Sequence, residues 1–172
     1  MGLSGGATAG RLALQFTILT AARSGETRGA RWAEFDFNNR LWRVPAERMK
    51  ARREHTVPLS CQAIEVLKLA SQLRRSNDPD EHIFPGIRGG QLSHMTLTKA
   101  LRAQVDGKWT VHGFRSTFRD WAAEMTSYPP AAVETALAHT IANKTEAAYH
   151  RTDYLEIRRK IMRDWGGFLS GR

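Results

Sequence analysis

The spacing of the hydrophobic residues changes twice along this chain, and that change limits the folds that the chain can adopt. Leu12, Phe16 and Leu19 recur at helical spacing in the first segment, over residues 7–22. Residues 35–59 instead contain short apolar runs separated by turn residues, which predicts three short strands. Helical spacing then returns. We therefore expect an α+β fold that is mostly helical, with a small three-stranded antiparallel sheet near its amino terminus.

Capping and turn residues give approximate limits for the individual elements. Ser24 begins a Ser-Gly-Glu-Thr sequence that can cap a second short helix, and Ser60 is expected to cap a helix that runs to Arg75. Asn38 and Asn39 supply the turn between the first two strands. The strands are expected over residues 35–37, 41–44 and 56–59, and the later helices over residues 93–105, 113–125, 130–138, 144–151 and 154–169.

The length and the net charge indicate one basic domain. A chain of 172 residues can bury a substantial core, and we expect residues 1–10 to be a flexible lead and residues 11–172 to form the domain. The formal net charge is +9, from 26 basic and 17 acidic side chains. Such an excess favours a polyanionic partner, with nucleic acid ahead of a membrane surface. A basic surface without a partner is the alternative.

Cysteine and histidine usage bears on location and metal binding. The single cysteine, Cys61, cannot form an internal disulfide, which favours a reducing, cytoplasmic location. Within these 172 residues the apolar stretches are too short and interrupted to span a membrane. The six histidines include no His-x-x-x-His spacing, and one cysteine excludes a Cys-x-x-Cys pair. We therefore expect neither a metal nor a cofactor.

A set of polar residues suits chemistry on a phosphodiester without a metal. It comprises two guanidiniums, two imidazoles, one ammonium and one phenol, and the sequence has no acidic cluster beside them. A phenol can attack phosphorus while cations stabilise the negative charge that develops there. The candidate catalytic residues are Arg23, Lys50, His112, Arg115, His139 and Tyr149.

Three of these residues belong to two pairs at helical spacing. His112 and Arg115 are three residues apart, so on a helix they share a face and can address one phosphate. Arg23 has Glu26 three residues later, where a carboxylate can orient the guanidinium. Taken alone, each pair is more often an exposed surface pair than part of a site.

A basic run over residues 48–55 is expected to form the hairpin between the second and third strands. Within it, Lys50 is the candidate that protonates the departing 5′-oxygen, and Arg52 is the second choice. The alternative is that the whole run attracts DNA phosphates without specificity, through Arg48, Arg52 and Arg53.

Tyr149 is the candidate nucleophile, and its position sets a geometric condition. Ten residues of unbroken helix would separate it from His139 by roughly 15 Å, so a break over residues 140–143 is required. Because free tyrosine has a pKa near 10, nearby groups must stabilise the phenolate or accept its proton. Tyr154 and Tyr128 are competing candidates, although Tyr154 begins an apolar helix and Tyr128 precedes two prolines in a turn.

Five segments, taken in order, resemble the catalytic domain of the tyrosine recombinase (phage integrase) family, particularly prophage and genomic-island integrases. They are TAARSGE (20–26), MKARREHTVPLS (49–60), HGFRSTFRDWA (112–122), LAH (137–139) and AAYHR (147–151). The resemblance extends over residues 12–169. One departure is the Ala21-Ala22 pair, where many relatives have Thr-Gly before the first arginine.

The resemblance implies a role for each candidate residue. Arg23 and Arg115 correspond to the paired phosphate clamp, with Glu26 as the acidic companion of the first arginine. Lys50 corresponds to the hairpin lysine that protonates the leaving group. His112 corresponds to the histidine that supports proton transfer, His139 to the histidine that bonds the phosphate, and Tyr149 to the nucleophile.

The resemblance also implies an activity and partners. Tyr149 would form a 3′-phosphotyrosine and release a 5′-hydroxyl, and the hydroxyl of a partner strand would reverse the step without ATP or a metal. The implied partner is double-stranded DNA at attachment sites, bound by a tetramer of the full-length protein. The resemblance leads us to expect that the amino-terminal DNA-binding domains of the family are absent from this sequence and that the fragment is a monomer. The alternatives are a type IB topoisomerase-like relaxation, a DNA-binding module with a vestigial catalytic set, and a generic basic domain.

Overall fold

The structure of the chain is a computed structural model, and it describes residues 8–139 and 153–171. The predicted α+β class is confirmed, because the described elements are mostly helices and include one small three-stranded antiparallel sheet. The helices are α1 (Ala9–Thr20), α2 (Ser24–Arg28), α3 (Cys61–Ser71), α4 (Thr96–Arg102), α5 (Gly113–Met125), α6 (Pro130–Ala136) and α8 (Leu155–Leu169). The strands are β1 (Phe35–Asp36), β2 (Leu41–Val44) and β3 (His55–Pro58), and short 3-10 turns lie at Trp32–Glu34 and Ala46–Arg48.

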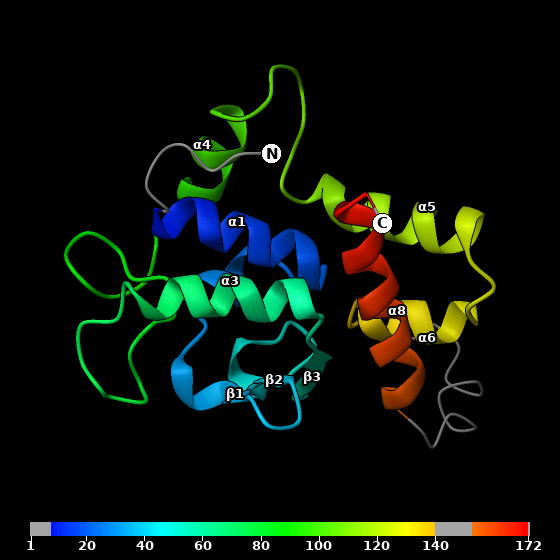
Figure 1. The fold of residues 1–172 in the computed structure, drawn as a ribbon, viewed down its shortest axis with the longest axis horizontal. Helices are drawn as coiled ribbons and strands as arrows, with labels where there is room; N and C mark the ends of the chain where they lie inside the picture. Colours follow the sequence, from blue (N-terminus) through cyan, green and yellow to red (C-terminus); the bar gives the residue numbers. More distant parts are fainter. Residues whose placement is uncertain (1–7, 140–152, 172) are drawn as a thin grey trace.

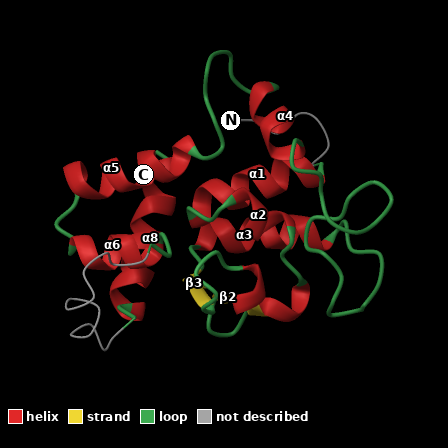
Figure 2. Ribbon diagram, turned by 180° about the vertical axis from the view of Figure 1, so that it is seen from behind, coloured by secondary structure: helices red, strands yellow, loops and turns green. Residues whose placement is uncertain are grey.

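The elements form two groups that lie side by side (Figure 1). One group, here called the amino-terminal lobe, contains α1 to α4 and the sheet. The other, the carboxy-terminal lobe, contains α5, α6 and α8, and the view from behind shows the same separation (Figure 2). Each lobe has its own cluster of buried hydrophobic side chains. The chain therefore offers a junction between two packed units, and a site there can draw on both.

Aromatic side chains fill the two clusters. In the amino-terminal lobe, the ring centroid of Phe16 lies 5.3 Å from that of Trp42 and 5.7 Å from that of Phe84. In the carboxy-terminal lobe, Phe118 meets Trp165 edge to face at 5.4 Å. The Trp165 indole also donates to the carbonyl of Ile18 on α1, at 2.9 Å. The lobes are thus joined by a buried hydrogen bond as well as by packing.

The sheet has the order β1-β2-β3, and both pairs of strands are antiparallel. Leu41 pairs with Pro58 and Val44 with His55. The β2–β3 connection therefore forms the hairpin that the sequence predicts. β3 begins at His55, one residue earlier than expected, because the Val44–His55 pair belongs to the ladder.

Several helix limits agree with the sequence, and others are shorter for identifiable reasons. α5 has the predicted limits, and the Ser60 hydroxyl caps α3 by accepting from the Ala63 N–H at 3.2 Å. α3 ends at Ser71 rather than residue 75, since the Arg75 N–H donates to the Glu81 carboxylate at 2.9 Å instead of to a helix carbonyl.

The helices around the second half of the chain also begin late or end early. α4 covers Thr96–Arg102 instead of residues 93–105. α6 ends at Ala136, because Ala138 adopts a left-handed conformation with φ 50°. Tyr154 is left-handed as well, at φ 53°, so α8 begins at Leu155. The helix predicted over residues 144–151 lies outside the described residues. None of the helices in the described part is both long and apolar enough to cross a membrane.

Candidate active site

Arg23 lies at the amino-terminal end of α2 and is held by Glu26. The Glu26 carboxylate accepts from the Arg23 backbone N–H and from its guanidinium Nη1, both at 2.8 Å. Glu26 is only 5% exposed, so this ion pair is sheltered from water. The carboxylate therefore caps the helix and fixes the guanidinium together, as the three-residue spacing predicts.

Arg115 lies in the first turn of α5 and is almost completely buried. Its guanidinium donates to the carbonyls of Ala21 and Leu137, the latter at 2.6 Å. Its Nη2 also lies 3.1 Å from Nε2 of His139. Burial, and then the nearby positive charge of Arg23, lower the pKa of Arg115 to about 10. The side chain is therefore still a cation at neutral pH.

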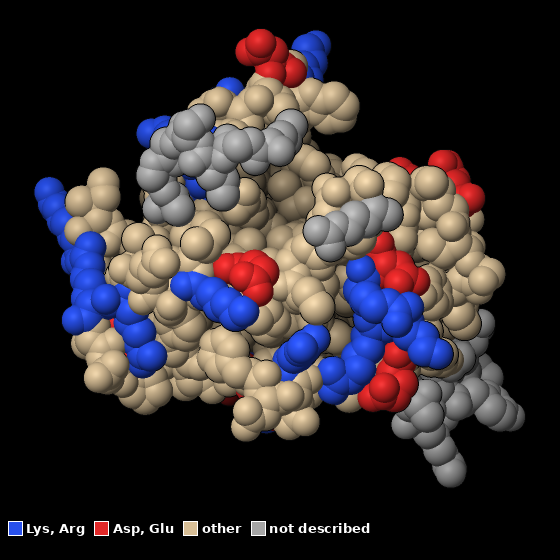
Figure 3. All heavy atoms as spheres, in the orientation of Figure 1, with Lys and Arg blue, Asp and Glu red and all other residues tan. Residues whose placement is uncertain are grey.

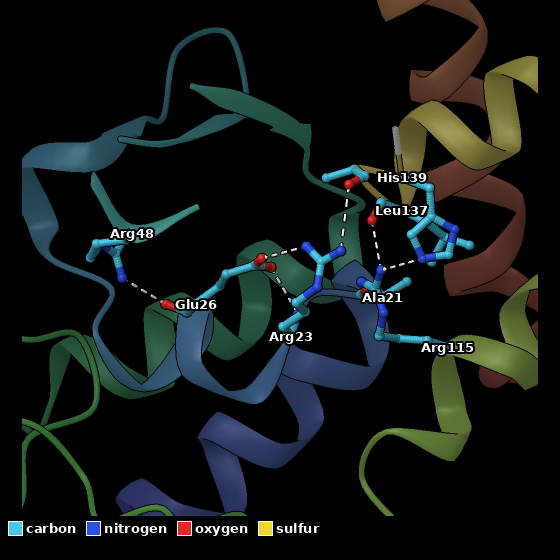
Figure 4. A network of polar contacts seen from close by, with 8 residues as sticks. Ala21, Arg23, Glu26, Arg48, Arg115, Leu137 and His139 are labelled. Carbon is cyan, nitrogen blue, oxygen red and sulfur yellow. Dashed lines mark hydrogen bonds and ion pairs between the residues drawn. The ribbon is translucent and has the colours of Figure 1, made fainter. Parts of the chain in front are cut away.

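Both guanidiniums are held by carbonyls at the carboxy-terminal ends of helices (Figure 4). Ala21 follows α1, while Leu137 and Ala138 follow α6. Arg23 Nη2 donates to the Ala138 carbonyl at 3.4 Å. Carbonyls at a helix end lack helical partners and carry partial negative charge, so they suit a buried cation. The ends of α1 and α6 thereby fix two cations near one another.

This arrangement leaves donors of Arg115 for a ligand. A guanidinium has five N–H groups, and three contacts in the described residues engage Arg115, with Ala21, Leu137 and His139. Within residues 8–139 and 153–171, these contacts leave two of the five N–H groups for a ligand. A planar guanidinium that is fixed in this way can contact two oxygens of one anion. The Arg23–Arg115 pair is therefore a candidate oxyanion site.

His139 joins this pair and has a carboxylate partner that the sequence analysis missed. Its Nδ1 lies 2.6 Å from Oε2 of Glu134, and the other oxygen of Glu134 lies 2.7 Å from Nε of Arg119. Glu134 precedes His139 by five residues, so a continuous helix would not bring them together on one face. They meet because α6 ends between them, where the His139 N–H donates to the Glu134 carbonyl at 3.0 Å.

The structure places His112 and Lys50 outside this hydrogen-bonded network. His112 is exposed and directly precedes α5, and its carbonyl accepts from the Arg115 N–H at 3.0 Å. Lys50, Arg52 and Arg53 are all exposed in the turn of the β2–β3 hairpin. The hairpin location of Lys50 agrees with the sequence analysis, whereas its approach to a phosphate stays a prediction.

Arg48 does not fit the predicted contact with DNA phosphates. Its guanidinium forms an ion pair with Glu34 and donates to the Glu26 carbonyl at 2.8 Å. The Trp42 indole donates to the same Glu34 carboxylate at 2.9 Å. Arg48 therefore braces α2 against the sheet inside the amino-terminal lobe. The sequence places it in a basic run, but its partners are 14 and 22 residues away.

The candidate nucleophile Tyr149 lies outside the described residues, but its two competitors can be assessed. The Tyr128 hydroxyl donates to the Asp164 carboxylate at 2.5 Å. Burial and that hydrogen bond raise the pKa of Tyr128 to about 12, which opposes phenolate formation. Tyr154 packs against the hydrophobic cluster of the carboxy-terminal lobe. Neither environment favours attack on a phosphate.

Two further buried polar residues near the junction were not predicted. Arg158 of α8 is 2% exposed and donates to the carbonyls of Thr56 at 2.5 Å and Asp153 at 2.6 Å. Beside it on β3, burial and then the charge of Arg158 lower the pKa of His55 to about 4. His55 is therefore neutral at pH 7. Arg158 ties α8 to the strand that follows the Lys50 turn.

The positive charge is not spread evenly over the surface. On the face drawn in Figure 3, Lys and Arg gather at one edge of the molecule and over α8, where acidic side chains lie among them. Arg159 pairs with Glu156 and Arg163 with Asp164 on that helix. This face of α8 is thus a set of ion pairs. In the described part of the chain, no group of three or more His, Cys, Asp or Glu side chains could hold a metal ion.

Comparisons with known proteins agree with this fold. Among solved structures, the XerA recombinase matches with a TM-score of 0.60 at 18% identity, over 88% of this chain and 55% of that one. The fold is therefore that of a tyrosine recombinase. Residues 5–156 match the model of the phage integrase family, and the chain belongs to that family.

Two sequence relatives have integrase names. The prophage integrase IntA of Escherichia coli K12 is 40% identical over 163 residues, which are 93% of this chain and 38% of that protein. The integrase of Enterobacteria phage P4 is 38% identical over 93% of this chain and 40% of its own length. The chain thus spans about two fifths of the relatives that it matches.

Proposed function

We propose that this chain is the catalytic domain of a site-specific DNA recombinase that cleaves and rejoins DNA through a 3′-phosphotyrosine. The observation that carries the proposal is the pair of fixed guanidiniums, Arg23 and Arg115, with His139 beside them at the junction of the lobes. Preorganised donors of this kind stabilise a transition state because they need no rearrangement when charge develops. Membership of the phage integrase family supports the same activity.

The proposed reaction gives each of these groups a role. Arg23 and Arg115 bind the non-bridging oxygens of the scissile phosphate while the Tyr149 oxygen attacks phosphorus and passes its proton to His112. The bond to the 5′-oxygen breaks, and Lys50 supplies the proton that makes it a hydroxyl. One phosphoester bond forms for each one that breaks, so the step requires neither ATP nor a metal. Attack by a 5′-hydroxyl of a second strand regenerates the tyrosine.

The remaining groups and partners belong to the same proposal. His112 supports proton transfer, and His139 bonds the phosphate beside Arg115. The substrate is double-stranded DNA at attachment sites, on which the full-length protein acts as a tetramer, in the cytoplasm at the nucleoid. Arg52 and Arg53, exposed in the same turn as Lys50, contact neighbouring phosphates. The net charge of +9 supports an electrostatic contribution to this binding.

A nicked duplex tests the proposal directly. If cleavage next to the nick releases a short 5′ fragment, the reverse step is lost and the protein is trapped on the 3′ end. We expect a covalent adduct with the wild-type chain, and none with Tyr149→Phe, which should still bind DNA. An adduct that persists in Tyr149→Phe would move the nucleophile to Tyr154 or Tyr128. Salt-sensitive DNA binding without any adduct would favour a binding module.

A supercoiled plasmid distinguishes the remaining enzymatic alternative. A type IB topoisomerase would relax the plasmid without joining partners. A recombinase should instead transfer the covalently held strand to a second duplex that supplies a 5′-hydroxyl. Relaxation without strand transfer would therefore contradict the recombinase assignment but retain the tyrosine chemistry.

A further inference from the structure

We propose that Glu134 is a positioning residue that fixes the tautomer and the orientation of His139, so that Nε2 is the ring nitrogen presented to the phosphate. This inference rests on the proposed function, because it assigns how one group of that site is prepared. Glu134 carries no assigned role in the sequence pattern. It lies on α6, while His139 follows the end of the same helix.

The contacts of the two ring nitrogens support this assignment. Nδ1 lies 2.6 Å from a carboxylate oxygen, which can only accept when it is ionised, so Nδ1 carries the proton. Nε2 lies 3.1 Å from Nη2 of Arg115, which can only donate. In the neutral ring Nε2 is therefore the acceptor. Only this tautomer satisfies both contacts. In the opposite tautomer, Nδ1 would be an acceptor facing the Glu134 carboxylate, and Nε2 would be a donor facing an N–H of Arg115.

Glu134 is itself held from a second helix. Its other oxygen forms the 2.7 Å ion pair with Arg119 of α5, one turn after Arg115. Among the described residues, the charged groups around His139 are Glu134 on α6, Arg115 and Arg119 on α5, and Arg23 at the start of α2. A carboxylate whose two oxygens both have a partner has a fixed orientation. Its contact with Nδ1 therefore fixes the orientation of the imidazole ring.

This geometry has a chemical consequence at the phosphate. When a phosphate oxygen accepts from the Arg115 guanidinium in place of Nε2, the ring can take up a proton from water at Nε2 and donate to the same phosphate. The Glu134 carboxylate then stabilises the imidazolium across the ring, as a carboxylate does for the histidine of a hydrolase triad. Loss of the carboxylate should therefore lower the cleavage rate without weakening DNA binding.

The test compares Glu134→Ala with Glu124→Ala, which removes an exposed carboxylate from α5. Nitrogen NMR of histidine-labelled protein reports which ring nitrogen of His139 carries the proton. His139→Gln identifies the signal. We expect an Nδ1 proton in the wild type and in Glu124→Ala, and a shift towards Nε2 in Glu134→Ala. No DNA is needed, so this result does not depend on the proposed function.

The second readout is single-turnover adduct formation on the nicked duplex. We expect Glu134→Ala to slow it about ten- to a hundredfold, at unchanged DNA affinity, and Glu124→Ala to stay within about twofold. Glu134→Gln keeps the side-chain size and removes the charge, so it provides a second variant if thermal unfolding reveals a folding defect. An Nδ1 proton retained in Glu134→Ala, or wild-type adduct rates in both Glu134 variants, would overturn the inference. A wild-type chain that forms no adduct would refute the proposed function alone.

Discussion

The two lobes each supply one arginine to the candidate site, but they hold it in different ways. Arg23 is fixed locally, by a carboxylate three residues later on the same helix. Arg115 depends on carbonyls that lie 94 and 22 residues away, at the ends of α1 and α6. Each arginine also reaches across the junction, since Arg23 contacts Ala138 and Arg115 contacts Ala21. The site is therefore complete only when the lobes are packed together.

This difference explains why the exposed fractions of the two side chains differ. Arg23 is 27% exposed, whereas Arg115 is 5% exposed. A buried cation needs partners for its N–H groups, and the unpaired carbonyls of two helix ends provide them. Arg23 is more exposed. It can therefore pair with the Glu26 carboxylate on one side and still present positive charge on its exposed side, where a phosphate would bind. Local and long-range fixation thus produce two cations of different accessibility at one place.

The largest expected effect comes from Arg115→Ala, which removes the arginine with long-range partners. We expect adduct formation to fall by about two to three orders of magnitude, the range seen when one transition-state donor is lost. Arg102→Ala, which removes an exposed arginine from α4, is the matched control and should leave the rate of adduct formation close to that of the wild type. Single-turnover cleavage of the nicked duplex gives the rate. A reduction of less than tenfold would contradict the clamp role of Arg115.

Arg158→Ala tests whether the junction also depends on a buried arginine outside the site. The change removes the hydrogen bonds that Arg158 donates to the carbonyls of Thr56 and Asp153, and hydrogen bonds from a charged group contribute about 1.5–3 kcal/mol each. We expect the free energy of unfolding to fall by about 2–4 kcal/mol, measured with urea. Arg163→Ala on the same helix removes an exposed arginine that pairs with its neighbour Asp164, and it should leave the free energy of unfolding close to that of the wild type. Equal losses in the two variants would mean that Arg158 does not tie the lobes together.

His55 offers a test that depends on pH. Because its pKa is about 4 when folded and near 6.5 when unfolded, the unfolded chain binds more protons between these values. Stability from this group is present above pH 6.5 and is lost as the pH falls towards 4. Between pH 6.5 and 5 we expect the wild type to lose about 1–2 kcal/mol more than His55→Gln, by urea unfolding. Parallel pH profiles would show that His55 is not kept neutral by burial.

The sequence predicts those parts of the site that depend on short-range spacing. The Arg23–Glu26 pair, the limits of α5 and the hairpin around Lys50 follow from patterns within a few residues. Long-range contacts carry no such pattern. Arg158 occupies an ordinary polar position of an amphipathic helix, and its partner Thr56 is 102 residues away.

Two features that the sequence patterns do not reveal have the same physical origin. Arg48 looks like part of an exposed basic run, yet Glu34 and the Glu26 carbonyl turn it inward. Glu134 escapes notice because α6 ends before His139, which changes the spacing that a continuous helix would give. Sequence patterns describe elements well, and they fail where an element ends or where two lobes meet.

The smallest expected effect concerns the end of α6, where the chain turns towards the site. Ala138 is left-handed at φ 50°, and its N–H and that of His139 close the helix onto Thr135 and Glu134, both at 3.0 Å. Glycine adopts this conformation without the penalty that a Cβ imposes, although it gains entropy in the unfolded chain. We expect Ala138→Gly to raise the free energy of unfolding by about 0.5–1 kcal/mol. Ala131→Gly, inside the same helix, should lower it by a similar amount. Equal losses of stability in both variants would contradict the left-handed conformation of Ala138, whose carbonyl accepts from Arg23.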